Sequence, residues 1–289
     1  MTSNFIKIMV SKIKQIILAI FDYLKSSFLL SNLNENELKG FISPLTKIRF
    51  LPHTKVKVPF CFGRTIRGVS FSKNILLDPN GRLCKDISNG LENEVLYKNM
   101  SKILEKERDC SAADIVQLCD NENLKNYPAW SIVLPWEKLN LEDKFRSYPK
   151  TFYLNRISKD FIFKDDTRKS IISMMYTSKF AENRVNQMKE LYERIINDGY
   201  IAKGYDLPKI NILLSDGKWR WFMSDGGNHR SYILSCLNHK FFTARIDSII
   251  DKNEVNDWHN VRNGIFSVGD AEDIFDSYFD GKNVLRGMV

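Results

Sequence analysis

The chain has 289 residues, of which 43% are hydrophobic and 27% charged. This length and composition are typical of a folded protein with a buried core and exclude an intrinsically disordered chain. The net charge of +8 is concentrated at the front: residues 1–60 hold nine Lys or Arg against three Asp or Glu, which accounts for six of the eight excess positive charges. A basic front end favours contact with an anionic surface such as lipid headgroups over a DNA-binding core.

Residues 1–31 have the pattern of an amphipathic helix, because apolar residues recur at steps of three and four with lysines between them. Two interpretations remain open. The helix lies in a membrane interface with its lysines at the headgroups, or it docks on the protein's own core. A secretory signal is disfavoured, since Asp22 interrupts the apolar stretch and no small-residue cleavage site follows.

The five cysteines are widely spaced and form no C-x-x-C pair. An odd number without paired spacing argues against a disulfide framework and indicates a reducing compartment. We therefore expect a cytoplasmic protein, peripheral on the inner face of the cytoplasmic membrane if the front helix binds lipid.

Residues 40–127 are expected to form an N-terminal α+β region of no assigned role. Short apolar runs separated by turn signals predict strands and hairpins over residues 45–87. Within them, "DPNG" at residues 78–81 is a strong turn signal.

Two helices and a strand are predicted next. Residues 91–109 have helical periodicity, and Ser111 is a candidate cap for a short helix within residues 111–124. The apolar run "WSIVL" at 130–134 predicts a strand, and Glu137 follows it in a loop where catalytic groups often lie.

A compact unit of helix, β-hairpin, glycine turn, helix and strand is predicted towards the C-terminal end. Its helices and strands are expected at residues 179–199, 208–215, 219–224, 231–239 and 240–250. "DGK" closes the hairpin, and "DGGNHR" at 225–230 forms the glycine turn. Residues 251–289 are expected to form a helical segment that packs on the core.

The glycine turn has the residues of an anion site. A turn that leads into a helix exposes backbone N–H groups at the positive end of the helix dipole. Gly226 and Gly227 allow close approach of the backbone, Arg230 can grip phosphate with two N–H groups, and His229 can hydrogen-bond phosphate or transfer a proton. The alternative is a structural turn with exposed polar groups.

This arrangement resembles the ParB/sulfiredoxin superfamily, in which a hairpin leads into a glycine turn at a helix N-terminus. Sulfiredoxins carry Gly-Gly-Cys-His-Arg and free-serine kinases of this fold carry Asp-Gly-His-His-Arg, where this chain reads "DGGNHR". The resemblance covers residues 128–250, with an insertion at about 140–184. It implies an α+β fold with a nucleotide-binding domain of that family.

The resemblance also implies which residues hold the nucleotide phosphates. They are Gly226, Gly227, Asn228, His229, Arg230 and Ser231. Because Asn228 stands where sulfiredoxins have their cysteine, peroxiredoxin repair chemistry is not implied. The acidic segment 251–289 takes the place of a helix-turn-helix domain, so we expect no sequence-specific DNA recognition.

The resemblance to kinases of this fold implies an ATP-dependent phosphotransferase that uses ATP, or another nucleoside triphosphate, with Mg²⁺. The expected catalytic residues are Glu137, Asp225 and His229. The partner is a hydroxyl acceptor, either a small metabolite or a membrane-linked saccharide. The histidines have no neighbours at metal-ligand spacing, so no protein-held metal is predicted. Two alternatives remain: a ParB-like nucleic-acid-binding protein or nuclease, and a nucleotide-binding switch without turnover.

Overall fold

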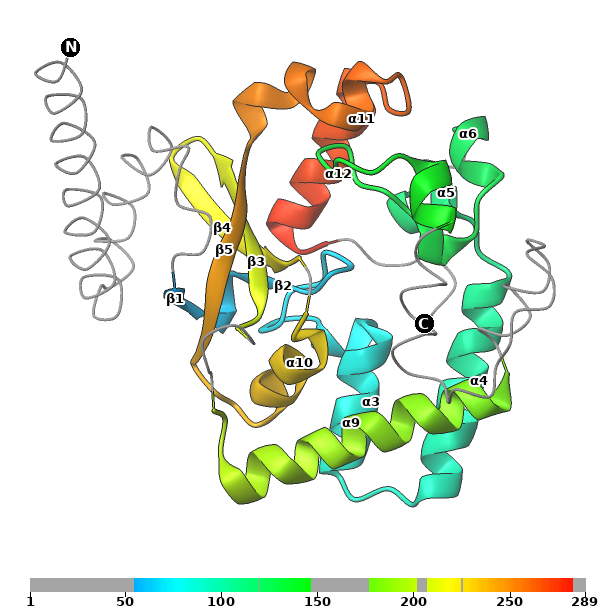
Figure 1. Ribbon diagram of the computed structural model, residues 1–289, viewed down its shortest axis with the longest axis vertical. Coiled ribbons are helices and arrows are strands. Elements are labelled where there is room, and N and C mark those ends of the chain that lie inside the picture. The colour runs from blue at the N-terminus through cyan, green and yellow to red at the C-terminus, as the bar shows by residue number, and fades with distance from the viewer. Residues whose placement is uncertain (1–54, 119, 147–176, 202–206, 225, 283–289) are drawn as a thin grey trace, which may run out of the picture.

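The computed structural model describes residues 55–118, 120–146, 177–201, 207–224 and 226–282. Within them helices and strands are mixed around one curled five-stranded sheet, which confirms the predicted α+β class (Figure 1). The predicted front helix over residues 1–31 and most of the insertion at 140–184 lie outside the described residues.

The sheet has the strand order β1-β5-β3-β4-β2. The strands span Lys55–Pro59 (β1), Gly63–Arg64 (β2), Lys209–Ser215 (β3), Lys218–Met223 (β4) and Phe241–Asp251 (β5). β1 is antiparallel to β5, β5 is parallel to β3, and β2 is parallel to β4. β3 and β4 form the predicted hairpin, whose turn residues Asp216 and Gly217 both have positive φ, as a tight hairpin turn requires.

Helices lie on both faces of the sheet. The longer helices span Pro79–Ser88 (α3), Asn93–Arg108 (α4), Ser178–Asp198 (α9), Asn228–Cys236 (α10) and Val268–Asp280 (α12). The short helices and 3-10 turns span Phe60–Phe62 (η1), Ile75–Leu77 (η2), Ala112–Val116 (α5), Glu122–Lys125 (α6), Ala129–Ser131 (η3), Lys252–Asp257 (η5) and His259–Arg262 (α11).

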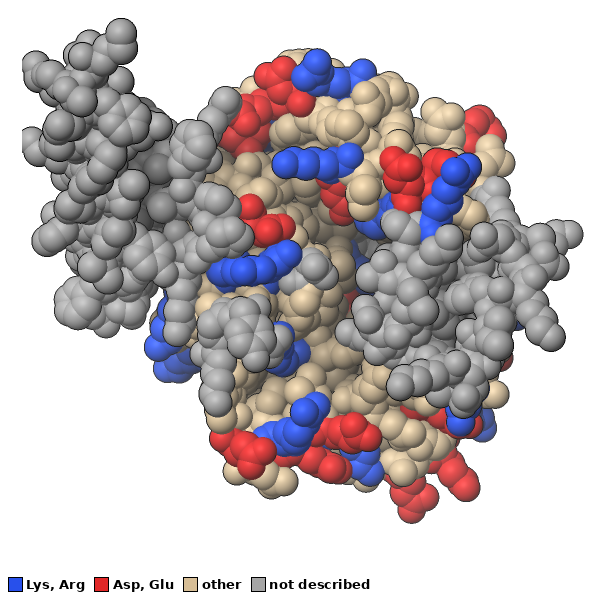
Figure 2. Space-filling view, viewed as in Figure 1, with Lys and Arg blue, Asp and Glu red and all other residues tan. Residues whose placement is uncertain are grey.

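Side chains along the strands alternate between two hydrophobic cores. In β4, Trp221 points into a core shared with α3, α4, α9 and α10, whereas the next residue, Phe222, points into a core shared with α5 and α12. α10 and α12 therefore lie on opposite faces of the sheet (Figure 1). On the outside, acidic and basic side chains are interspersed over the described surface of the face in Figure 2.

The predicted unit towards the C-terminal end is confirmed element by element. The helix over residues 179–199 is α9, the hairpin is β3 and β4, the second helix is α10 and the last strand is β5. The helix over 91–109 is α4. Ser111 caps α5, where its side chain accepts a hydrogen bond from the backbone N–H of Asp114.

The prediction of strands and hairpins over residues 45–87 is wrong for α3. Asp78 and Pro79 begin this helix: the Asp78 carboxylate accepts a 2.9 Å hydrogen bond from the backbone N–H of Asn80, and Pro79 occupies the first helical position. Asp as N-cap and Pro as first residue are helix-start signals, but Asp-Pro-Asn-Gly is an equally good turn sequence. Between residues 55 and 87, only β1 and β2 are strands.

The predicted strand at residues 130–134 is also wrong. η3 covers the start of this segment and irregular chain the rest. Its apolar character has another cause, because Val133 and Leu134 are buried in the core that includes α12. The two strands that border β5 are β1 and β3, and neither comes from residues 130–134.

Candidate functional site

The turn before α10 is built on two glycines with positive φ. Gly226 and Gly227 have φ angles of 65° and 80°, in the left-handed region that favours glycine. Gly227 is the N-cap of the nine-residue helix α10, and no side chain caps this end. A Cβ atom at Gly227 would lie 2.5 Å from Cγ of Pro208, so only glycine fits here. The turn thus brings backbone N–H groups and the positive end of the helix dipole to one place.

The side chains of the first turn of α10 differ in their surroundings. The Ser231 hydroxyl is buried and donates a 2.7 Å hydrogen bond to the Asn228 carbonyl, so it holds the turn together. The Asn228 side-chain oxygen is buried and has no hydrogen-bond donor in the described part of the chain. His229 and Arg230 are half-buried on the same turn. Asp225 lies outside the described residues.

Glu137 lies elsewhere in the molecule. Its carboxylate forms a 2.8 Å ion pair with Lys144, and its carbonyl accepts a hydrogen bond from the side chain of Asn260 in α11. Its loop neighbours Leu134 and Leu141 pack into the core of α12, on the face of the sheet opposite α10. The structure therefore does not bring Glu137 together with the turn before α10.

A polar cluster that sequence analysis missed joins α10 to α3. The Tyr232 hydroxyl, one turn into α10, donates a 2.8 Å hydrogen bond to Asp78, the N-cap of α3. The side chain of Asp78 is fully buried. Burial, the negative charge of Asp78 and the hydrogen bond to it raise the pKa of Tyr232 well above its usual value. Tyr232 therefore stays protonated and remains a hydrogen-bond donor at any physiological pH.

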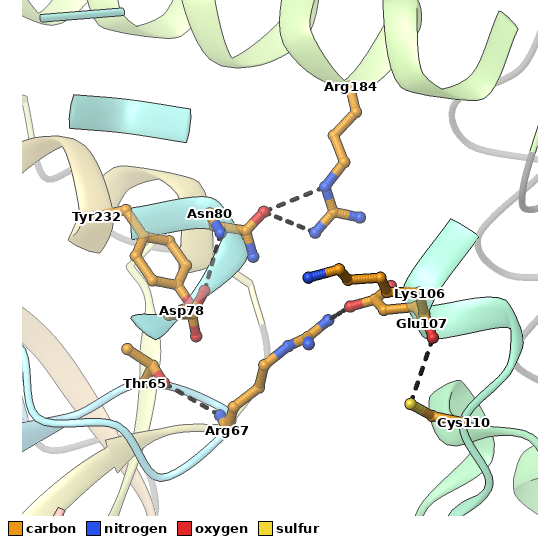
Figure 3. Close-up of polar contacts among 9 residues, drawn as sticks. All are labelled: Thr65, Arg67, Asp78, Asn80, Lys106, Glu107, Cys110, Arg184 and Tyr232. Atoms are coloured by element: carbon orange, nitrogen blue, oxygen red, sulfur yellow. Dashed lines mark hydrogen bonds and ion pairs between the residues drawn. The ribbon is translucent and has the colours of Figure 1, made fainter. Parts of the chain in front are cut away.

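The cluster continues to α9 and α4 (Figure 3). The Oδ1 atom of Asn80 accepts hydrogen bonds from Nε and Nη2 of Arg184, at 3.1 and 2.7 Å. The guanidinium of Arg67 forms an ion pair with Glu107. Burial lowers the pKa of Arg67, but Glu107 and then Asp78 more than offset this effect, so the pKa is raised and Arg67 is always charged.

We expect Tyr232→Phe to lower the free energy of unfolding by about 1–3 kcal/mol, because it leaves a buried carboxylate without one of its donors. Urea unfolding at pH 7 measures this effect. Tyr97→Phe is the matched control: its hydroxyl makes a bond of the same 2.8 Å length to Asn186, but in solvent. Equal losses from both variants would contradict the assigned role of the buried pair.

Neither a metal site nor a membrane span is found among the described residues. No cluster of three or more His, Cys, Asp or Glu side chains there is arranged to hold a metal ion. No helix in these parts of the chain combines the length and apolar character needed to cross a membrane.

Comparison of the chain with models of known protein families, with curated protein sequences and with solved structures gives no match. The residues of the glycine turn and of the adjoining cluster are therefore the basis for inferring function.

Proposed function

We propose that this protein is an ATP-dependent phosphotransferase that transfers a phosphoryl group to a hydroxyl acceptor. The observation that carries the proposal is the glycine turn before α10, in which Gly227 packs against Pro208 so tightly that a Cβ atom has no room. Backbone that is held this close and this rigidly at a helix N-terminus suits the phosphates of a nucleotide. The buried amide oxygen of Asn228 has no donor among the described residues, so it would accept a hydrogen bond from a hydroxyl or N–H group of a ligand and not from the phosphates themselves.

Phosphoryl transfer depends mainly on positioning and charge neutralisation, so a phosphate-binding turn and one base are sufficient. In the proposed reaction the acceptor oxygen bonds to the γ-phosphorus of ATP, the bond from that phosphorus to the bridging oxygen of ADP breaks, and the hydroxyl proton passes to a base. Arg230 binds the phosphates. His229 and Asp225, next to the turn in sequence, are the candidate bases. Mg²⁺ that enters with ATP would neutralise phosphate charge.

Glu137 is left out of the proposed reaction, because its loop packs on the face of the sheet opposite α10 and its carboxylate pairs with Lys144. The acceptor is a small metabolite or a membrane-linked saccharide. A membrane-linked saccharide as acceptor requires that the basic front segment, residues 1–60, binds the cytoplasmic face of a membrane.

The test is the affinity for ATP with Mg²⁺, measured by calorimetry. Arg230→Ala should weaken binding about ten- to hundredfold, because it removes a charge-assisted contact to phosphate worth about 1.5–3 kcal/mol. Arg194→Ala makes the same change at an exposed position of α9 and should bind like the parent. Equal affinities of the two variants would refute the proposed nucleotide site.

Two further results would identify the alternatives. Tight, sequence-specific DNA binding at physiological salt would favour a ParB-like nucleic-acid-binding protein over a phosphotransferase. Nucleotide binding through Arg230, with no transfer or hydrolysis of the γ-phosphate under any condition, would favour a nucleotide-binding switch.

A further inference from the structure

Two cysteines that are about 150 residues apart in sequence meet where α10 packs on α3. Cys84 lies in the middle of α3, and Cys236 is the last residue of α10. The Cys84 thiol donates a hydrogen bond to the sulfur of Cys236, which in turn donates a 3.9 Å hydrogen bond to the carbonyl of Gly81, one turn earlier in α3. Two thiols in such contact need only a small movement to reach the roughly 2 Å separation of a disulfide.

The two thiols differ in their access to solvent. Cys84 is fully buried in the core that α3 shares with α10. Cys236 is half-buried and packs against the edge of this core. The chain leaves α10 directly after it, because Leu237 is the C-cap of the helix and Asn238 has a φ of 60°. A small oxidant in solution can therefore reach Cys236 before it reaches Cys84.

The two thiols also differ in their protonation. The hydrogen bond from Cys84 lowers the pKa of Cys236; burial opposes this effect and the charge of Lys85 adds to it. The same hydrogen bond and burial raise the pKa of Cys84. Cys110 is half-buried as well, but burial and the nearby acidic residues raise its pKa. Because the thiolate is the nucleophilic form, Cys236 is the more reactive member of the pair, and Cys84 keeps its proton.

We propose that Cys236 is a site of reversible oxidation by hydroperoxides and that the product is a disulfide between Cys236 and Cys84. The proposal stands independently of the phosphotransferase function. It follows from the contact between the thiols, the access of solvent to only one of them, and the reactivity of a thiolate towards peroxide. The disulfide would join the end of α10 to the middle of α3.

The reaction has two steps. In the first, the thiolate sulfur of Cys236 bonds to an oxygen of the hydroperoxide, the O–O bond breaks, and the leaving oxygen takes up a proton, so that Cys236 becomes a sulfenic acid. In the second, the sulfur of Cys84 bonds to that of Cys236 and the S–O bond breaks; the departing hydroxide takes the proton of Cys84 and leaves as water. The two sulfurs together lose the two electrons that the peroxide gains.

The experiment treats the full, folded chain with one equivalent of hydrogen peroxide at pH 7 and then blocks the remaining thiols with N-ethylmaleimide. Trypsin digestion without reductant releases Cys84 in residues 83–85 and Cys236 in residues 231–240, so the disulfide yields one linked peptide that mass spectrometry identifies. We expect this peptide to be the main disulfide product and to disappear after treatment with dithiothreitol. Its absence from the oxidised parent chain, or recovery of Cys236 mainly in disulfides with other cysteines, would refute the proposal.

Two variants test the roles of the individual thiols. Cys84→Ser keeps a hydrogen-bond donor beside Cys236 but cannot form the disulfide, so Cys236 should stop at the sulfenic acid and be labelled by dimedone. Cys61→Ser removes a cysteine that is more exposed than Cys236 and should leave the yield of the linked peptide unchanged. Circular dichroism checks that both variants are folded, and the peptide map of the parent chain decides the matter if Cys84→Ser is not. Dimedone labelling of Cys61 but not of Cys236 in folded Cys84→Ser would show that Cys236 is not the reactive thiol.

Discussion

Gly227→Ala is expected to lower the free energy of unfolding by about 2–5 kcal/mol and to abolish measurable ATP binding. The added Cβ would lie 2.5 Å from Cγ of Pro208, and the φ of 80° is strained for any L-residue. The left-handed backbone costs about 1–2 kcal/mol and overpacking a further 1–3 kcal/mol. Relief of the clash must move the turn away from Pro208, and the N–H groups that the proposed nucleotide site needs move with it.

A comparison of Gly226→Ala with Gly227→Ala separates the cost of the left-handed backbone from the cost of the clash with Pro208. Gly226 has a similar φ of 65°, but a Cβ there would meet nothing within 4 Å. This variant should lose only about 1–2 kcal/mol of unfolding free energy. Urea unfolding and calorimetry on both variants make the comparison. If the two substitutions have equal effects, the close packing against Pro208 does not shape the turn.

Arg64→Met should lower the free energy of unfolding by about 3–4 kcal/mol. Arg64 is a buried cation whose guanidinium donates hydrogen bonds to the carbonyls of Tyr278 and Phe279, at the C-terminal end of α12, and to that of Gly63. Burial, and next the charge of Arg220, lower the pKa of Arg64 to about 10, so it stays protonated at neutral pH. Methionine fills similar space but removes the donor of the Phe279 carbonyl, while the carbonyls of Tyr278 and Gly63 keep only the backbone N–H groups of Gly281 and Phe71.

The control for Arg64→Met is Arg262→Met, at an exposed position of α11, which should change stability by less than about 0.5 kcal/mol. Thermal unfolding followed by circular dichroism would detect the difference between the two variants. A loss below 1 kcal/mol for Arg64→Met would show that water replaces the guanidinium at the end of α12.

The elements that local sequence determines were predictable. In α9, Val185, Met188 and Ile195 are buried at helical spacing, and Gly199 follows the helix with a φ of 76°. α3 was not predictable, because "DPNG" serves equally as a turn and as a helix start. The contacts that favour the helix come from residues distant in sequence, because Leu83 and Cys84 of α3 are buried in the same core as α10.

In the candidate site, too, local features could be predicted from the sequence and contacts between distant segments could not. The glycine turn is a local feature, so its residues could be named from the sequence. The polar cluster that joins α10 to α3, α4 and α9 is assembled by folding: Arg67 and Glu107 are 40 residues apart, Asn80 and Arg184 are 104 apart, and Asp78 and Tyr232 are 154 apart. On its own helix Arg184 is one polar residue among several, and no periodicity distinguishes it. Only the tertiary arrangement shows that these side chains share a space.

The strand order has a consequence for the synthesis of the protein in the cell. β1 pairs along its whole length with β5, and Pro59 lies opposite Phe241, about 180 residues later. At roughly 5–20 residues per second, a ribosome needs on the order of 10–40 s to make the partner that β1 requires. During this time Val56 and Val58, which are buried in the finished protein, have no strand to cover them. Until translation has passed β5, the backbone edge of β1 therefore lacks the strand that pairs with it in the finished protein and is open to pairing with other chains.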